Sequence, residues 1–124
     1  MVPLRRAAGL LLGIAAACAH APRGKDGGPV AEGVASYYGE SLRGNRTASG
    51  ERFDPDRFTA AHPSLAFGTC LRVENTANGR SVRVRVNDRG PFVHGRILDV
   101  SKAAALALDF VRQGVARVRL FLCA

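Results

Sequence analysis

The sequence is poor in the residues on which many kinds of site depend, with three cysteines and three histidines among 124 residues. No spacing of cysteine or histidine suits a metal site, and no glycine-rich loop of the phosphate-binding kind is present. The serines lack a histidine arrangement that would activate a nucleophile. The side chains left for chemistry are carboxylates and His62, which suit acid and base work on glycosidic bonds without a metal or cofactor.

The sequence also lacks an apolar run long enough to cross a bilayer. The run at residues 7–17 follows the basic pair Arg5 and Arg6 and precedes small residues, as in a secretory signal. Residues 15–18, Ala-Ala-Ala-Cys, resemble the lipobox of bacterial lipoproteins, with Ala instead of Leu at the first position. We expect a signal peptide over residues 1–18 with lipid on Cys18. Ordinary cleavage after Ala17 or Ala21 is the alternative.

Acidic residues are few, 10 against 18 Lys and Arg, and the net charge is +8. Without Arg5 and Arg6 the surplus falls to +6. Such a surplus bears on partners rather than on fold. For an exported protein, an acidic envelope polymer is a better match than nucleic acid. A cationic surface that only keeps the protein soluble is the alternative.

The cysteine count is odd, which leaves an even pair if Cys18 carries lipid. Cys70 and Cys123 would then form a disulfide in an oxidising compartment. Two buried free thiols are the alternative, because the apolar neighbours Leu71 and Leu122 would also permit them.

Residues 19–32 are rich in Gly, Pro, Ala and charge and are expected to form a flexible tether before a folded domain at residues 33–124. Short strands are expected at residues 33–39, 69–75, 80–88, 95–101 and 115–124. Asn78-Gly79 predicts a hairpin between the second and third of these strands. Residues 58–68 are expected to be helical or irregular, and residues 102–110 to form a helix with Ser101 as its N-cap. The pattern favours a small, mainly β barrel.

Asp88 ends a strand at an Asn-Asp-Arg-Gly-Pro turn, where a buried carboxylic acid could protonate a glycosidic oxygen. A tight turn with no catalytic role is the alternative. Asp99 is first interpreted as a capping or hydrogen-bonding carboxylate, Glu51 as a solvated loop acid and His62 as a structural histidine that could also shuttle protons. The adjacent Tyr37 and Tyr38 should point to opposite faces of a strand, one into the core and one toward a sugar ring.

Three motifs occur in order: T-A-S-G-E at residues 47–51, A-A-H-P-S-L-A-F-G-T at residues 60–69 and N-D-R-G-P-F at residues 87–92. In this order and spacing they resemble the RlpA (rare lipoprotein A) family of bacterial envelope proteins, from about Gly33 to Leu122. The resemblance implies a six-stranded double-psi β-barrel with one or two short helices. It also implies a lytic transglycosylase of peptidoglycan that acts on peptide-stripped glycan strands. Family members commonly have Trp where Tyr37 stands.

The resemblance also implies roles for individual residues. The catalytic candidates are Asp88, His62, Glu51 and Asp99, with Asp88 as the acid and base and His62 orienting or sharing the proton transfers. The candidates for substrate binding are Tyr37, Tyr38, Thr47, Asn87, Arg89 and Arg96. We expect a monomer, anchored in the outer membrane through Cys18 and facing the periplasm, whose partners are glycan strands and possible division or wall-remodelling proteins. A soluble periplasmic or secreted form is the alternative location.

Two other functions compete with catalysis. Expansin-like barrels bind or loosen polysaccharides without cutting them, and such a module could keep the same acids to contact hydroxyl groups. A lipid-anchored basic barrel could also serve as a structural link between the outer membrane and the wall.

Overall fold

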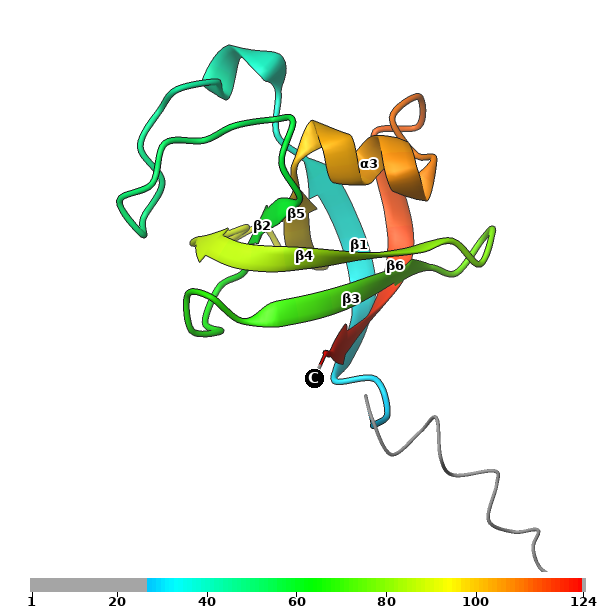
Figure 1. Cartoon of the computed structure of the whole chain (residues 1–124). Coiled ribbons are helices and arrows are strands. Elements are labelled where there is room, and N and C mark those ends of the chain that lie inside the picture. The colour runs from blue at the N-terminus through cyan, green and yellow to red at the C-terminus, as the bar shows by residue number, and fades with distance from the viewer. Residues whose placement is uncertain (1–26, 124) are drawn as a thin grey trace, which may run out of the picture.

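The computed structural model describes residues 27–123 and shows a closed barrel of six strands (Figure 1). The strands are β1 (Ala31–Tyr37), β2 (Thr59–Ala61), β3 (Cys70–Asn75), β4 (Ser81–Asp88), β5 (Arg96–Val100) and β6 (Val115–Leu122). A 3-10 helix, η1 (Glu40–Leu42), and an α-helix, α3 (Lys102–Leu108), complete the elements of the described part. The predicted six-stranded barrel with one or two short helices is confirmed.

The strand order around the barrel is β1-β5-β2-β4-β3-β6, which differs from the order along the chain. The pairs β1/β5 and β2/β4 are parallel, and the remaining pairs are antiparallel. Parallel neighbours need long crossover connections, and here the chain passes through η1, β2, β3 and β4 between β1 and β5, and through β3 between β2 and β4. Closure of the sheet leaves no edge strand exposed.

The alternation along β4 explains which side chains fill the barrel. Val84 and Val86 are buried, whereas Ser81 and Arg83 on the opposite face are exposed, as the sequence pattern predicts. β3 contributes Leu71 and Val73 to the same core in the same way.

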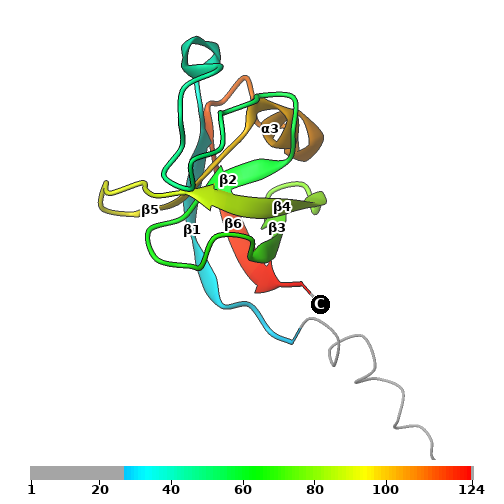
Figure 2. The same cartoon turned by 60° about the vertical axis from the view of Figure 1, so that its left-hand side comes forward.

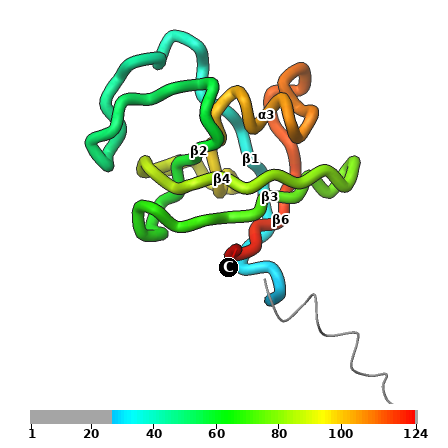
Figure 3. Tube along the Cα trace, viewed as in Figure 1, coloured from blue at the N-terminus to red at the C-terminus, as the bar shows by residue number. Residues whose placement is uncertain are grey.

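The helix α3 begins directly after Ser101, the residue that the sequence predicts as its N-cap. The Ser101 hydroxyl accepts a hydrogen bond from the backbone N–H of Ala104, which confirms Ser101 as the N-cap. The helix ends at Asp109 in the left-handed region and buries Ala104, Ala105 and Leu108. It packs against β4 and β1 (Figures 1 and 3). No helix of the described residues is long and apolar enough to span a membrane.

The prediction for residues 58–68 is wrong at its start, because Thr59–Ala61 form the strand β2. All three residues are buried between β4 and β5, so this strand shows no polar and apolar alternation. Short apolar runs of this kind cannot be told from helical segments by periodicity. A smaller difference concerns β1, which begins at Ala31, two residues before the predicted start of the domain. The predicted signal peptide and Cys18 lie outside the described residues.

Cys70 and Cys123, the pair that the sequence analysis favoured, are joined by a disulfide with their Cα atoms 5.4 Å apart. The bond ties the start of β3 to the end of β6, where the Cys123 N–H also donates to the Cys70 carbonyl oxygen. The two cysteines are 53 residues apart in sequence, so the bond closes a long loop.

The double variant Cys70→Ser/Cys123→Ser should lower the free energy of unfolding by about 4 kcal/mol, because the unfolded chain regains the entropy of that loop. Urea unfolding of the two proteins measures the difference. Adding a reductant should lower the stability of the wild type but not that of the double variant. Equal stability of the two oxidised proteins would contradict this account.

Candidate active site

The carboxylate of Asp88 is held by three donors at the end of β4. Its Oδ2 accepts from the Tyr38 hydroxyl at 2.5 Å, and its Oδ1 accepts from the backbone N–H groups of Ala48 at 2.8 Å and Arg89 at 2.9 Å. These donors come from the end of β1, from the loop before β2 and from the turn after β4. Asp88 is therefore the point at which three separate segments meet.

A second carboxylate, Asp99, lies two strands away from Asp88. The residue between them is Ala61, which pairs with Asp88 of β4 on one side and with Asp99 of β5 on the other. Neighbouring strands lie about 4.8 Å apart, so the Cα atoms of the two aspartates are separated by about 10 Å. Asp99 accepts hydrogen bonds from the Ser36 hydroxyl and, at 3.0 Å, from Arg96. The buried Nε of Arg96 has no partner in the part of the chain that the structure describes.

Tyr38 lies close to both carboxylates. Its ring stacks on Phe53 with centroids 4.5 Å apart, and this packing holds the phenol over Asp88. Burial raises the pKa of Tyr38 first, and the hydrogen bond to Asp88 and the charges of Asp88 and Asp99 raise it further. The hydroxyl therefore stays protonated and acts as a donor.

Glu51 forms a separate network with β4. Its carboxylate accepts from Arg85 at 2.6 and 3.0 Å and from Asn87 Nδ2 at 3.1 Å. The Arg85 guanidinium, followed by the Asn87 amide, lowers the pKa of Glu51. Glu51 is thus ionised near neutral pH and suits an accepting, loop-fixing role better than proton donation.

His62 follows β2, and its backbone N–H donates to the Asp88 carbonyl oxygen at 3.1 Å. The Nδ1 atom of its ring accepts from the N–H groups of Ser64 and Leu65, both at 3.1 Å. Burial, followed by the charge of Arg89, lowers the pKa of His62. The ring is therefore neutral at neutral pH with its proton on Nε2, where it can donate one hydrogen bond.

The predicted substrate-binding residues divide into those near the carboxylates and those turned elsewhere. Tyr37 donates to the Val111 carbonyl oxygen and packs edge-on against Phe110, on the face opposite to Tyr38. Thr47 donates to the Glu51 carbonyl oxygen and fixes the loop in front of β4. Arg89 lies 4.1 Å over the Phe67 ring.

Arg89 is also bound by the loop that follows β2. Its guanidinium donates to the carbonyl oxygens of His62 at 3.2 Å and Leu65 at 2.7 Å. The structure therefore brings Tyr38, Asn87 and Arg96 to the acids, and it places the Arg89 guanidinium on the loop that follows β2.

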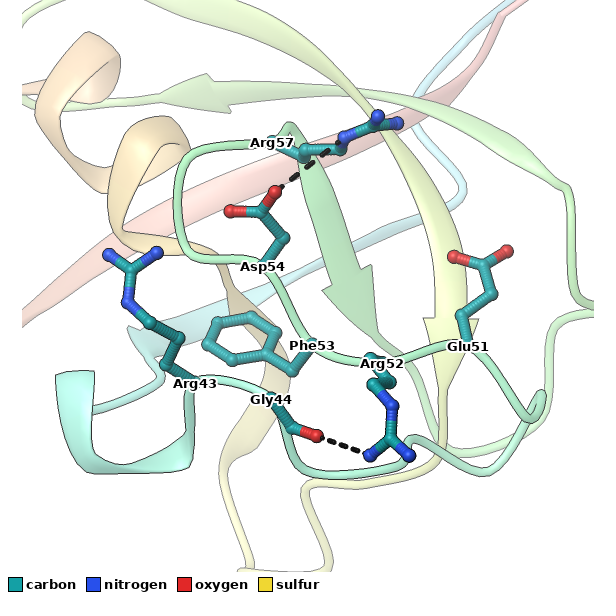
Figure 4. Close-up of a pocket in the computed structure, with 7 residues that line it drawn as sticks. All are labelled: Arg43, Gly44, Glu51, Arg52, Phe53, Asp54 and Arg57. Atoms are coloured by element: carbon teal, nitrogen blue, oxygen red, sulfur yellow. Dashed lines mark hydrogen bonds and ion pairs between the residues drawn. The ribbon is translucent and has the colours of Figure 1, made fainter.

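A pocket of about 400 Å³ lies beside this site within the loop between η1 and β2 (Figure 4). It is lined by Arg43, Gly44, Glu51, Arg52, Phe53, Asp54 and Arg57. Arg57 is paired with Asp54, and Arg52 donates to the Gly44 carbonyl oxygen. Of the four catalytic candidates, Glu51 lines this pocket and Asp88, His62 and Asp99 do not, so the candidate site is the end of the barrel around Asp88 and not this hollow. Within residues 27–123, no three Cys, His, Asp or Glu side chains are grouped as a metal site would require.

Sequence reasoning missed Ser36, Phe53 and Arg85. Arg85 and Asn87 are two residues apart on one strand, so they share a face and both reach Glu51. That spacing was a usable signal. The stacking of Phe53 on Tyr38 and the bond from Ser36 to Asp99 are long-range contacts with no local signal.

Comparison with known proteins gives one family match and several relatives. Residues 30–120 match the family model described as "Lytic transglycolase". The chain is 57% identical over 88 residues to the endolytic peptidoglycan transglycosylase RlpA of Neisseria meningitidis, covering 71% of this chain and 37% of that protein. It is 50% identical over 93 residues to the protein of the same name from Campylobacter jejuni, covering 75% of this chain and 34% of that one. The chain thus spans about a third of the length of these relatives.

Two solved structures share the fold. An expansin of Clavibacter michiganensis superposes with a TM-score of 0.57 at 28% identity, covering 75% of this chain and 49% of that one. The Streptomyces papain inhibitor gives a TM-score of 0.56 at 24% identity, covering 76% of this chain and 94% of that one. Together with the family match, these structures confirm the predicted double-psi β-barrel.

Replacing Glu51 by Gln should lower stability at pH 7 by up to about 1 kcal/mol, since the Arg85 pair is partly exposed. Because the pKa of Glu51 is lowered in the folded protein, its contribution to the free energy of unfolding is fully present above the pKa of Glu in the unfolded chain, about 4.3. The contribution is lost as the pH falls through the folded-state value, so the two proteins should converge at low pH. Urea unfolding at pH 7 and pH 3 measures this. A double-mutant cycle with Arg85→Gln isolates the pair, and a coupling energy of zero at pH 7 would refute the assignment.

Proposed function

The chain belongs to the RlpA family, and on that premise we propose that it is an endolytic lytic transglycosylase of peptidoglycan, with Asp88 as the group that transfers the proton. The substrate is the MurNAc-β-1,4-GlcNAc bond of peptide-stripped strands, and the product ends in 1,6-anhydro-MurNAc. The observation that carries the proposal is the carboxylate of Asp88, fixed by three donors and two strands away from a second carboxylate. The similarity to relatives named endolytic peptidoglycan transglycosylases supports it.

The reaction needs no water. The bond between C1 of MurNAc and the bridging oxygen breaks, and the C6 hydroxyl oxygen of the same MurNAc forms the new bond to C1. The Asp88 carboxylate takes the proton of the C6 hydroxyl as that oxygen attacks C1, and it gives a proton to the leaving oxygen, so the carboxylate ends the cycle as it began. A single carboxylate can serve both steps because the two oxygens flank the same carbon.

The neighbouring residues orient this group. Tyr38 holds one Asp88 oxygen, and the Ala48 and Arg89 N–H groups hold the other. Neutral His62 offers an Nε2–H to a sugar oxygen. Glu51 is a positioning residue that fixes the loop in front of β4, and Asp99 binds sugar hydroxyls. A site preorganised in this way loses little free energy to reorganisation during the reaction.

A second candidate is glycan binding without cleavage. It is favoured by the structural likeness to the Clavibacter expansin, a mutant of which was crystallised with cellohexaose. Glu51 is hydrogen-bonded to Arg85, and His62 Nδ1 accepts from two backbone N–H groups. Side chains held in this way also suit a rigid binding surface.

Digestion of amidase-stripped glycan strands, read by mass spectrometry, separates the candidates. The wild type should give fragments ending in 1,6-anhydro-MurNAc, each one water lighter than a hydrolysis product, and Asp88→Asn should give none. Asp109→Asn is the matched control, because Asp109 caps α3 and Asn tolerates its left-handed conformation. Reducing-end fragments would mean hydrolysis. Intact strands that bind the protein would establish the binding module.

Tyr38→Phe should lower kcat by about 10- to 100-fold with little change in KM, because it removes a hydrogen bond to a charged group worth about 1.5–3 kcal/mol. The phenyl ring keeps the stacking on Phe53, so the thermal unfolding midpoint should change little. Steady-state kinetics of the two proteins on the same strands measure the effect. A kcat equal to that of the wild type would show that Tyr38 does not position Asp88.

A further inference from the structure

Two exposed phenylalanines lie on loops next to the candidate site. Phe92 is 80% exposed and Phe67 is 42% exposed, although large aromatic side chains usually bury most of their surface. The proposed mechanism uses neither of them. Exposed apolar surface of this kind commonly marks a binding site.

Phe92 lies in the turn that follows β4, four residues after Asp88. Its ring lies against Gly90, where an added Cβ would be 3.7 Å from Cε2 of Phe92. Gly90 has a φ of +113°, a conformation that other residues rarely adopt, so the backbone conformation before Phe92 depends on this glycine. A hydrogen bond from the Arg96 N–H to the Val93 carbonyl oxygen at 3.0 Å closes the turn that begins directly after Phe92.

Phe67 lies on the loop between β2 and β3, and Arg89 connects this loop to the turn that holds Phe92. The Arg89 guanidinium covers the Phe67 ring at 4.1 Å and donates to the carbonyl oxygens of His62 and Leu65. Both loops lie on the side of the barrel where β4 ends (Figures 1 and 2). Arg89 thereby fixes Phe67 relative to Asp88, and Phe92 follows Arg89 by three residues in the chain.

We propose that Phe67 and Phe92 form an aromatic rim that packs against the C–H faces of the sugar rings next to the scissile bond. The rim is a substrate-positioning subsite and rests on the proposed function of the Asp88 site. Sugar rings present weakly positive C–H groups, which match the negative face of an aromatic ring. Contact with the glycan strand also removes apolar surface of the aromatic rim from water.

The chain offers an internal control for aromatic exposure. Phe58 is 48% exposed but precedes β2, whereas the residue of β2 that lies between the two acids is Ala61 at the other end of the strand. Three residues of strand separate the two positions by about 10 Å. Phe58 is therefore outside the rim, and its replacement should leave glycan binding unchanged.

The test measures binding of amidase-stripped glycan strands by calorimetry in the Asp88→Asn background, and kcat/KM with Asp88 intact. Phe92→Ala should weaken both by about tenfold, since burial of one aromatic side chain is worth roughly one factor of ten. Phe92→Tyr should restore them and Phe92→Leu should not, because Leu keeps apolar area but has no ring. Phe58→Ala should match the unsubstituted protein, and thermal unfolding should confirm that every variant is folded.

Each result has a distinct meaning. If Phe92→Ala binds and cleaves like the parent, the rim is refuted while the Asp88 assignment stands. If Phe92→Leu restores function fully, the turn makes a general apolar contact, as with a protein or lipid partner, and the sugar assignment is wrong. If the strands bind without cleavage and Phe92→Ala weakens that binding, the rim stands and the transglycosylase proposal fails. If the wild type neither binds nor cleaves the strands, both proposals fail.

Discussion

The site depends on the pairing of one short strand with two neighbours. Ala61 in β2 pairs with Asp88 of the parallel strand β4 and with Asp99 of the antiparallel strand β5. The separation of the Cα atoms of the two aspartates is therefore set by backbone pairing, and hydrogen bonds to their side chains orient the carboxylates. A strand of only three residues persists here because both of its edges are paired and all three side chains are buried.

The loops are placed by hydrogen bonds to the same strand ends. The Ala48 N–H donates to the Asp88 carboxylate, and the Ser49 N–H donates to the Asn87 carbonyl oxygen. The Glu51 carboxylate accepts hydrogen bonds from the side chains of Arg85 and Asn87. Buried or half-buried carboxylates are stable in a fold only when their oxygens are satisfied in this way. The same bonds that compensate the acids thus attach the long loop before β2 to the barrel. Structure and candidate chemistry share one network.

Part of this arrangement could be predicted from sequence, and part could not. The alternation of Val84 and Val86, the Asn78-Gly79 hairpin and the Ser101 cap are local patterns, and the fold follows them. The strand β2 was not predicted, because its three residues are all buried and show no alternation of polar and apolar side chains. The sequence motifs identify Asp88, His62 and Glu51 as candidate site residues. The hydrogen bonds of these residues, however, are formed largely with segments that are distant in sequence. Tyr38 reaches Asp88 across 50 residues, and Arg89, predicted to bind substrate, holds the loop that carries Phe67, a contact with no local signal.

The most direct test of the Asp88 site is a crystal structure of the Asp88→Asn protein with a bound tetrasaccharide of alternating MurNAc and GlcNAc. We expect the bridging oxygen between the central sugars to lie within hydrogen-bond distance of residue 88, with His62 Nε2 facing the same disaccharide. A tetrasaccharide bound instead in the pocket around Arg43, Phe53 and Arg57 would contradict the assignment of Asp88, because none of the groups proposed to move protons lines that pocket.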